Sequence, residues 1–245
     1  MDVDRLFAEQ QKAGRSVLTE LHAKDILRAW GLPVPACLVA VNLEQAQAHA
    51  TQIGYPVALK AHSPAILHRS DVGGVKLNLG DGGAVADAYA QIRTACAAID
   101  PDVHVLVQPM LAPGVEVIIG ATQDPQFGTL LMFGLGGVTT ELFKDVTFRL
   151  PPLDRSAAAA MVSSIEAFPL LDGFRGQPRT DLDAIADILV AVSTLVTRYP
   201  FIRELDLNPV LAYPHGAAVV DARMVIDRPR GDEPIGTHRA FEVEE

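Results

Sequence analysis

The segment YPVALKAHSPAILHRSDVGGVKLNL, from Tyr55 to Leu79, decides the architecture of this 245-residue chain. It contains two apolar runs, 56–60 and 74–79, which are rich in valine and leucine and are bounded by proline or glycine. Runs of this length and composition predict two β-strands that flank a polar loop.

Lysines lie in both predicted strands, although lysine is scarce in this chain, which has 15 arginines and only 5 lysines. Lys60 ends the first strand and Lys76 lies within the second. Ammonium groups there can act as point charges on phosphates, and the turn at Gly73 and Gly74 lets backbone N–H groups approach an anion closely. The alternative is a pair of surface lysines whose charged ends reach solvent. The pattern GxxxxGK[ST] is absent, so this is not a P-loop.

The loop between the two strands contains His62, His68, Arg69 and Asp71. A neutral imidazole is a nucleophile towards phosphoryl groups, so such a loop can carry a reactive histidine. Most histidines in loops have no chemical role, and the pattern alone leaves both interpretations open.

Outward from this segment, the chain alternates between predicted helices and strands, which indicates an α+β fold. Ala23, Ile26, Leu27 and Trp30 follow helical spacing and predict a helix over 19–30. Pro109 and the Ala-Pro-Gly turn at 112–114 predict a hinge over 108–114. We therefore expect two α+β subdomains, 1–110 and 111–227, and a loose polar tail over 228–245.

A predicted hairpin, with strands over 204–212 and 217–226, brings acidic residues together. A four-residue loop would pair Ala212 with Ala217 and would therefore place Asn208 opposite Asp221. Strand alternation then puts Asp206, Asn208 and Asp221 on one face. Two carboxylates and an amide oxygen suit a hard cation such as Mg²⁺. The alternative is a solvated strand face on which Arg223, opposite Asp206, is the partner.

Three further features of the second half are open to two interpretations. The sequence Gly-Leu-Gly-Gly over 134–137, which includes Gly136 and Gly137, could form a nest of N–H groups for an anion or simply a tight turn. Glu116 begins a strand just beyond the hinge, and Arg149 follows the glycines. Neither residue indicates a function by itself.

Composition excludes several classes of protein. Hydrophobic residues make up 49% of the chain, which predicts a folded core, and the net charge of -10 disfavours nucleic acid as a partner. The longest charge-free stretch is interrupted by glycines and is shorter than the roughly 20 residues that a transmembrane helix needs. Cys37 and Cys96 lack metal-site spacing and are expected to be buried. The acidic start is unlike a signal peptide, so we expect a cytoplasmic protein without a membrane partner.

Taken in order, four stretches resemble the ATP-grasp domain of the beta subunit of ADP-forming acyl-CoA synthetases (acetate-CoA ligase, ADP-forming). They are YPVALKAHSPAILHRSDVGGVKLNL (55–79), VEVIIGATQDPQFGTLLMFGLGG (115–137), KDVTFRLPPL (144–153) and ELDLNPV (204–210). The resemblance covers residues 16–227, and the chain is more distantly similar to the succinyl-CoA synthetase beta subunit.

This resemblance implies an ATP-grasp fold in which two α+β subdomains clasp ATP or ADP. Lys60 and Lys76 would contact phosphates, Glu116 would bind the ribose hydroxyls, and His68 would carry a phosphoryl group. Asn208 and Asp221 would bind Mg²⁺, and Asp206 would support them. The adenine edge would meet Gln108, Pro109, Met110 and Leu111. Further phosphate or loop positions would be Gly73, Gly74, Gly136, Gly137 and Arg149.

The chain differs from the family pattern at two positions. Pro109 stands where the family more often has an acidic residue, and it lacks an N–H that could contact adenine. Arg69 replaces the usual lysine and keeps the charge. Neither change removes a predicted phosphate contact or metal ligand.

No Rossmann fingerprint or other CoA-binding segment is found, so thioester chemistry would lie on a separate CoA-binding alpha-type subunit. Two alternatives stay open: a self-contained ATP-grasp ligase that joins a carboxylate to an amine, and a nucleotide sensor without turnover. The sequence does not distinguish ATP from GTP or identify the acyl group.

Overall fold

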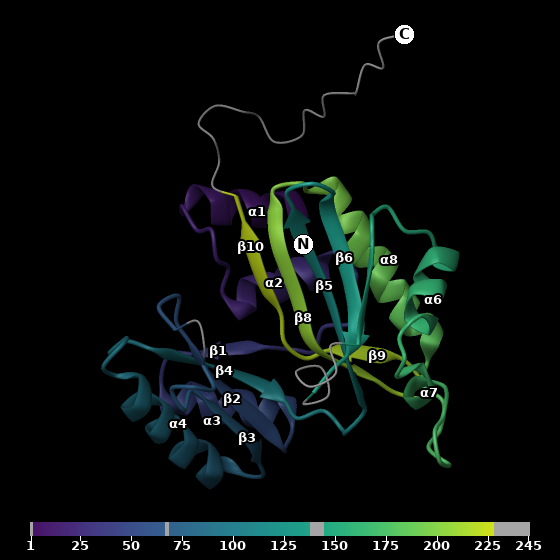
Figure 1. The fold of residues 1–245 in the computed structure, drawn as a ribbon. Coiled ribbons are helices and arrows are strands. Elements are labelled where there is room, and N and C mark those ends of the chain that lie inside the picture. The colour runs from purple at the N-terminus through teal and green to yellow at the C-terminus, as the bar shows by residue number, and fades with distance from the viewer. Residues whose placement is uncertain (1, 67–68, 138–144, 228–245) are drawn as a thin grey trace.

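The protein contains two antiparallel β-sheets, each with helices packed on one face (Figure 1). The structure is a computed structural model that describes residues 2–66, 69–137 and 145–227. The smaller sheet has four strands and the larger has six. Each sheet has its own hydrophobic core, so the chain forms two structural units.

The smaller unit consists of a sheet in the order β1-β4-β2-β3 and two helices. Its elements are β1 (Leu38–Ala40), α3 (Leu43–Ile53), β2 (Val57–His62), β3 (Val75–Leu79), α4 (Gly82–Cys96) and β4 (His104–Pro109). Helices α3 and α4 cover the face that carries Val57, Leu59 and Ala61. Alternation along β2 therefore places Lys60 on the opposite face.

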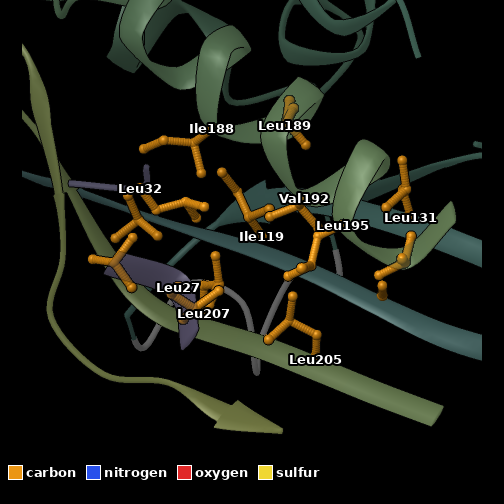
Figure 2. Close-up of a cluster of buried hydrophobic side chains, with 14 of the residues drawn as sticks. Leu27, Leu32, Ile119, Leu131, Ile188, Leu189, Val192, Leu195, Leu205 and Leu207 are labelled. Carbon is orange, nitrogen blue, oxygen red and sulfur yellow. The ribbon is translucent and has the colours of Figure 1, made fainter. Parts of the chain in front are cut away.

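The larger unit is built on a sheet in the order β10-β8-β5-β6-β7, with β9 paired to β8. Its strands are β5 (Val115–Asp124), β6 (Gly128–Leu135), β7 (Val146–Arg149), β8 (Ile202–Ala212), β9 (Ala217–Val219) and β10 (Arg223–Ile226). Its helices are α1 (Val3–Lys12), α2 (Glu20–Ala29), α6 (Arg155–Ser163), α7 (Phe168–Leu171) and α8 (Leu182–Arg198). Figure 2 shows side chains of α2 and α8 packed against Ile119 of β5 and against Leu205 and Leu207 of β8.

Helices α1 and α2 belong to the core of the larger unit, although they precede the smaller unit in the chain. Phe7 and Leu27 are fully buried in that core, and Val17 forms a β-bridge with Val225, which is a residue of β10. The predicted boundary near residue 110 matches the passage from β4 to β5. It does not anticipate that the first 32 residues pack with the second unit.

Side-chain oxygens that accept a backbone N–H cap several of the helices: Thr19 caps α2, Asn42 caps α3, Asp154 caps α6 and Asp181 caps α8. Both cysteines are buried, as predicted. The sequence patterns did not predict α1, α7 or the short edge strand β7.

The predicted register of the hairpin is confirmed at both ends. Ala212 pairs with Ala217, and Asp206 pairs with Arg223. The returning chain is not one strand, however, because residues 220–222 interrupt it between β9 and β10. Asp221 therefore leaves the sheet at the level of Asn208, where its side chain can reach another element.

None of the helices in the described part of the chain is long and apolar enough to cross a membrane.

Candidate functional site

Lys60 connects the two structural units. Its ammonium group lies 2.9 Å from Glu20 Oε1 and 2.9 Å from Asp221 Oδ2. Burial alone would lower the pKa of Lys60, but the carboxylates of Glu20 and Asp221 outweigh it and raise the pKa above its ordinary value. The ammonium group therefore keeps its charge at the junction between the sheets.

Four other charged side chains surround Lys60. Glu20, Lys24, Lys60, Arg69 and Asp221 together form what we call the ion-pair cluster. Arg69 pairs with Glu20 Oε2 and, at 3.3 Å, with Asp221 Oδ1, while Lys24 lies 2.6 Å from Glu20 Oε1. Burial would raise the pKa of Glu20, but the charges of Lys60, Lys24 and Arg69 lower it to about 2. Glu20, Lys60 and Arg69 are therefore charged near neutral pH.

The acidic residues of β8 lie on the sheet face that the helices do not cover. Leu205 and Leu207 are buried in the core, so alternation directs Asp206 and Asn208 to the opposite face. Burial raises the pKa of Asp206, and the negative charges of Glu204 and Asp221 raise it further, against the opposing charge of Arg223. Asp206 and Asp221 are thus close enough to interact, as the predicted metal set requires.

The residues present fit a hard cation. Arg223 forms an ion pair with Glu204 at 3.4 Å, and it also lies opposite Asp206, where its charge opposes the rise in the pKa of that carboxyl. The alternative in which Arg223 is the partner of Asp206 therefore stays open. Within the described ranges no three His, Cys, Asp or Glu side chains are grouped for a metal ion. A cation here would rest on Asp206, Asn208 and Asp221 and on oxygens from water or a phosphate, an arrangement typical of Mg²⁺.

The predicted hinge begins at the end of β4. Gln108 is buried, and its Oε1 accepts a hydrogen bond from Lys24 Nζ at 2.7 Å. Met110 donates its N–H to the carbonyl of Pro56 at 3.0 Å. Pro109 and Leu111, like Met110, are half-buried. Backbone groups of 108–111 therefore lie directly beside β2, which carries Lys60.

Glu116 is exposed at the start of β5, where a hydroxyl-bearing ligand could reach it. Its carbonyl accepts the N–H of Gly136 at 2.7 Å. A Cβ added at Gly136 would lie 2.9 Å from the Cβ of Glu116, and Gly137 has a φ of 72°. Close packing against Glu116 thus explains Gly136, and the positive φ explains Gly137. The contact of either glycine with a phosphate stays a prediction.

Gly73 and Gly74 also have structural partners. Gly73 donates to the carbonyl of Ser70 at 3.1 Å, and Gly74 donates to that of Arg69 at 2.8 Å. Gly73 has a φ of 71°, which favours glycine. The glycines therefore shape the loop that presents Arg69, and a phosphate contact through their N–H groups would require these bonds to be exchanged.

Two predicted phosphate contacts do not join the cluster. Lys76 pairs with Leu59 in the β2–β3 register, so its side chain leaves the sheet on the other face from Lys60. Arg149 shares the face of Leu131, which is a core residue, whereas Asp206 lies on the opposite face. Neither side chain therefore lies on the same face as the cluster, and the phosphate contacts of Lys76 and Arg149 stay predictions.

His68 lies outside the described residues. His62, on the face of β2 that carries Lys60, lines a cavity of about 60 Å³ together with Glu20, Arg69 and Arg223. Burial lowers the pKa of His62 to about 4, and the neighbouring imidazoles His22 and His104 contribute in the same direction. His62 is therefore neutral at physiological pH.

Glu20 and Lys24 were not predicted as members of the site. Both lie on the stripe of α2 that Ala23 and Leu27 mark as buried, at spacings of three or four residues. Lys24 is also one of only five lysines. The sequence does contain a signal for them, because Glu20 and Lys24 are a charged pair on an apolar stripe and lysine is scarce in this chain.

A family model described as an ATP-grasp domain matches residues 9–226. The beta subunit of ADP-forming acetate-CoA ligase II from Pyrococcus furiosus is 45% identical over 228 residues, which cover 91% of this chain and 97% of that protein. ADP-forming acetate-CoA ligase I of Archaeoglobus fulgidus is 45% identical over 88% of this chain, which matches only 32% of that longer protein.

One similar solved structure is acetyl-coenzyme A synthetase 1 of Ca. Korarchaeum cryptofilum. The matched chain is 43% identical with a TM-score of 0.82, and the match covers 92% of this chain and all of that chain. That structure contains coenzyme A and Mg-AMPPCP, and its phosphohistidine segment points towards the nucleotide-binding site.

Proposed function

Since this chain belongs to the ATP-grasp domain family, we propose that it is the nucleotide-binding, phosphoryl-transferring beta-type subunit of an ADP-forming acyl-CoA synthetase. The reaction is acyl-CoA plus ADP plus phosphate to carboxylate, CoA and ATP, and it is reversible. This chain performs the transfer between nucleotide and histidine.

One observation carries the proposal: Lys60 of the smaller sheet lies 2.9 Å from Asp221, which belongs to the connection between β9 and β10 of the larger unit. A cation suited to a phosphate and a carboxylate suited to a metal are thereby neighbours at the junction of the two units. Ligand sites favour such junctions. Arg69 adds a second cation beside the same carboxylate.

The phosphates of ATP or ADP lie against Lys60 and Arg69, and Glu116 and the 108–111 segment hold the nucleoside. Phosphoryl transfer demands positioning and neutralisation of charge more than covalent chemistry by the protein. Asp206, Asn208 and Asp221 hold Mg²⁺, which, when bound, offsets charge on the terminal phosphates. Because Asp221 now pairs with Lys60 and Arg69, loading the site exchanges some of these contacts.

His68 is the covalent carrier. A neutral ring nitrogen attacks the terminal phosphorus of ATP, so that a nitrogen–phosphorus bond forms and the bond to the bridging oxygen breaks. ADP leaves with that oxygen, and one proton is released from the imidazole. In the opposite direction, phosphorylated His68 transfers its group to ADP.

A CoA-binding alpha-type subunit is the partner in this proposal. The similar Pyrococcus protein is a beta subunit by name, and the Archaeoglobus protein is about three times as long as its matched region. The remaining part of such an enzyme has room for the acyl and CoA chemistry. Substrate selection then belongs to the partner.

Incubating the purified chain with labelled ATP and Mg²⁺ tests the carrier. We expect acid-labile, base-stable label on the protein, retained in a His62→Gln control and lost in His68→Ala. A wild-type chain that stays unlabelled even with the partner supplied would contradict the relay and favour a ligase or sensor.

Asp221→Asn tests the metal assignment. The change removes a negative charge from the metal set, so we expect Mg-ADP affinity to fall at least about tenfold. Asp227→Asn, which changes an exposed pair with Arg203, is the matched control. Unchanged affinity in Asp221→Asn would remove this residue from the site.

A further inference from the structure

Two members of the ion-pair cluster, Glu20 and Lys24, have no place among the residues assigned to the nucleotide. Both lie on α2, and neither side chain is exposed. We propose that they are positioning residues: Glu20 holds the phosphate-binding cations in place, and Lys24 holds Gln108 at the base-binding segment. This inference rests on the proposed function and assigns one helix to both ends of the nucleotide site.

Glu20 uses both of its carboxylate oxygens on the cations. Oε1 lies 2.9 Å from Lys60 Nζ, and Oε2 accepts from the guanidinium of Arg69. Lys60 and Arg69 come from the smaller unit, whereas α2 is packed in the larger one. Glu20 therefore fixes two flexible cations relative to Asp221, which also belongs to the larger unit.

Lys24 cannot reach a phosphate itself, because its side chain has no exposed surface. Its ammonium group makes two contacts: 2.6 Å to Glu20 Oε1 and 2.7 Å to Gln108 Oε1. The first contact balances the charge of Glu20. The second fixes the Gln108 side chain at the first residue of the 108–111 segment.

The packing of α2 makes it a rigid support. Ala23, Ile26 and Leu27 are fully buried in the larger core, so the first two turns of the helix cannot shift without disturbing that core. Glu20 and Lys24 are separated by one turn and point in the same direction. The helix can therefore set the distance between the phosphate end and the base end.

A purely stabilising role for the pair makes a different prediction. Buried ion pairs contribute little net stability compared with well-packed neutral side chains, whereas removal of one partner is costly. If the pair only stabilised the fold, its removal would lower the free energy of unfolding and weaken the binding of all ligands equally. If the residues position the site, each substitution would weaken binding either at the phosphate end or at the base end.

The test measures the affinity of the folded chain for two probes, Mg-tripolyphosphate and adenosine. Glu20→Asp keeps the charge but shortens the side chain, so it cannot bridge Lys60 and Arg69. We expect its tripolyphosphate affinity to fall at least about tenfold, equivalent to about 1.4 kcal/mol, while adenosine affinity changes less than about twofold. For Lys24→Met we expect the adenosine affinity to fall at least about tenfold while the tripolyphosphate affinity changes less than about twofold.

Two further variants keep the result interpretable. Asp25→Asn, on the same helix but in the exposed pair with Arg28, is the matched control and should bind both probes normally. The double variant Glu20→Gln, Lys24→Gln removes both buried charges together, so it leaves no unpaired charge between them. We expect it to fold and to lose tripolyphosphate affinity at least about tenfold.

In the single variants Glu20→Asp and Lys24→Met, equal loss of both probes or unchanged binding of both would overturn the positioning role. Failure of the double variant to fold would overturn it as well. If wild-type protein binds neither Mg-ADP nor the probes, the proposed function itself fails. If the wild type binds and every variant binds equally well, only the role of Glu20 and Lys24 is rejected.

Discussion

Replacing His62 with glutamine should make the protein less sensitive to mild acid. Burial and then the neighbouring imidazoles His22 and His104 lower the pKa of His62 from 6.5 to about 4. The unfolded chain therefore binds a proton more readily than the folded chain. The contribution of His62 to the free energy of unfolding is therefore highest above pH 6.5, and it decreases as the pH falls towards 4.

The size of this effect follows from the two pKa values. For values of 6.5 and about 4, linkage predicts a loss of about 2 kcal/mol between neutral pH and pH 5. His62 is only half-buried, so solvent screening reduces the expected loss to about 1 kcal/mol. Burial also lowers the pKa of His22, which leaves a residual slope of the same sign in the variant.

Denaturant unfolding at about pH 7.5 and about pH 5 measures the difference. We expect the decrease in free energy between these conditions to be about 1 kcal/mol smaller in His62→Gln than in the wild type. His215→Gln, at an exposed position in the hairpin turn, should match the wild type. A His62→Gln variant with the full wild-type decrease would refute the argument that burial keeps this imidazole neutral.

Three further outcomes can be checked by unfolding and binding measurements. Gly136→Ala should lower the free energy of unfolding by about 1–3 kcal/mol, because the new Cβ would lie 2.9 Å from the Cβ of Glu116. Gly80→Ala is the control, because a Cβ at Gly80 would meet open space. Equal losses in the two variants would contradict the packing explanation. Lys60→Met should weaken Mg-ADP binding at least about tenfold, and Lys76→Met should weaken it less; equal losses would place both lysines at the phosphates. Arg149→Gln, on the core side of the larger sheet, should change Mg-ADP affinity less than about twofold. A larger loss in equilibrium dialysis would support the predicted phosphate contact of Arg149.

Local spacing was enough to predict parts of the site. The hairpin register depends only on a four-residue loop and strand alternation, and the observed pairing of Ala212 with Ala217 confirms it. The helix predicted over 19–30 likewise depends on spacings of three and four residues, and α2 is observed at Glu20–Ala29. These features form within a few residues of one another, so a single sequence contains the information that specifies them.

The ion-pair cluster could not be predicted in the same way. Lys60 contacts Glu20 and Asp221, which lie 40 and 161 positions away in the chain. Strand alternation identifies two faces of a strand but not which register joins β2 to β3. The prediction therefore grouped Lys60 with Lys76 by residue type, whereas the fold groups it with Arg69.

The burial of the cluster indicates from which side a ligand approaches. Glu20 and Lys24 side chains are 0% exposed, Lys60 is 7%, Arg69 is 19% and Asp221 is 29% exposed. The cluster is thus closed at α2 and open towards the hairpin. Three cationic side chains against two carboxylates leave one formal positive charge within the cluster, which a bound anion would offset. Such an anion would enter from the open end, where Asp206 and Asn208 also lie, so the phosphate and the metal are expected to arrive on the same side.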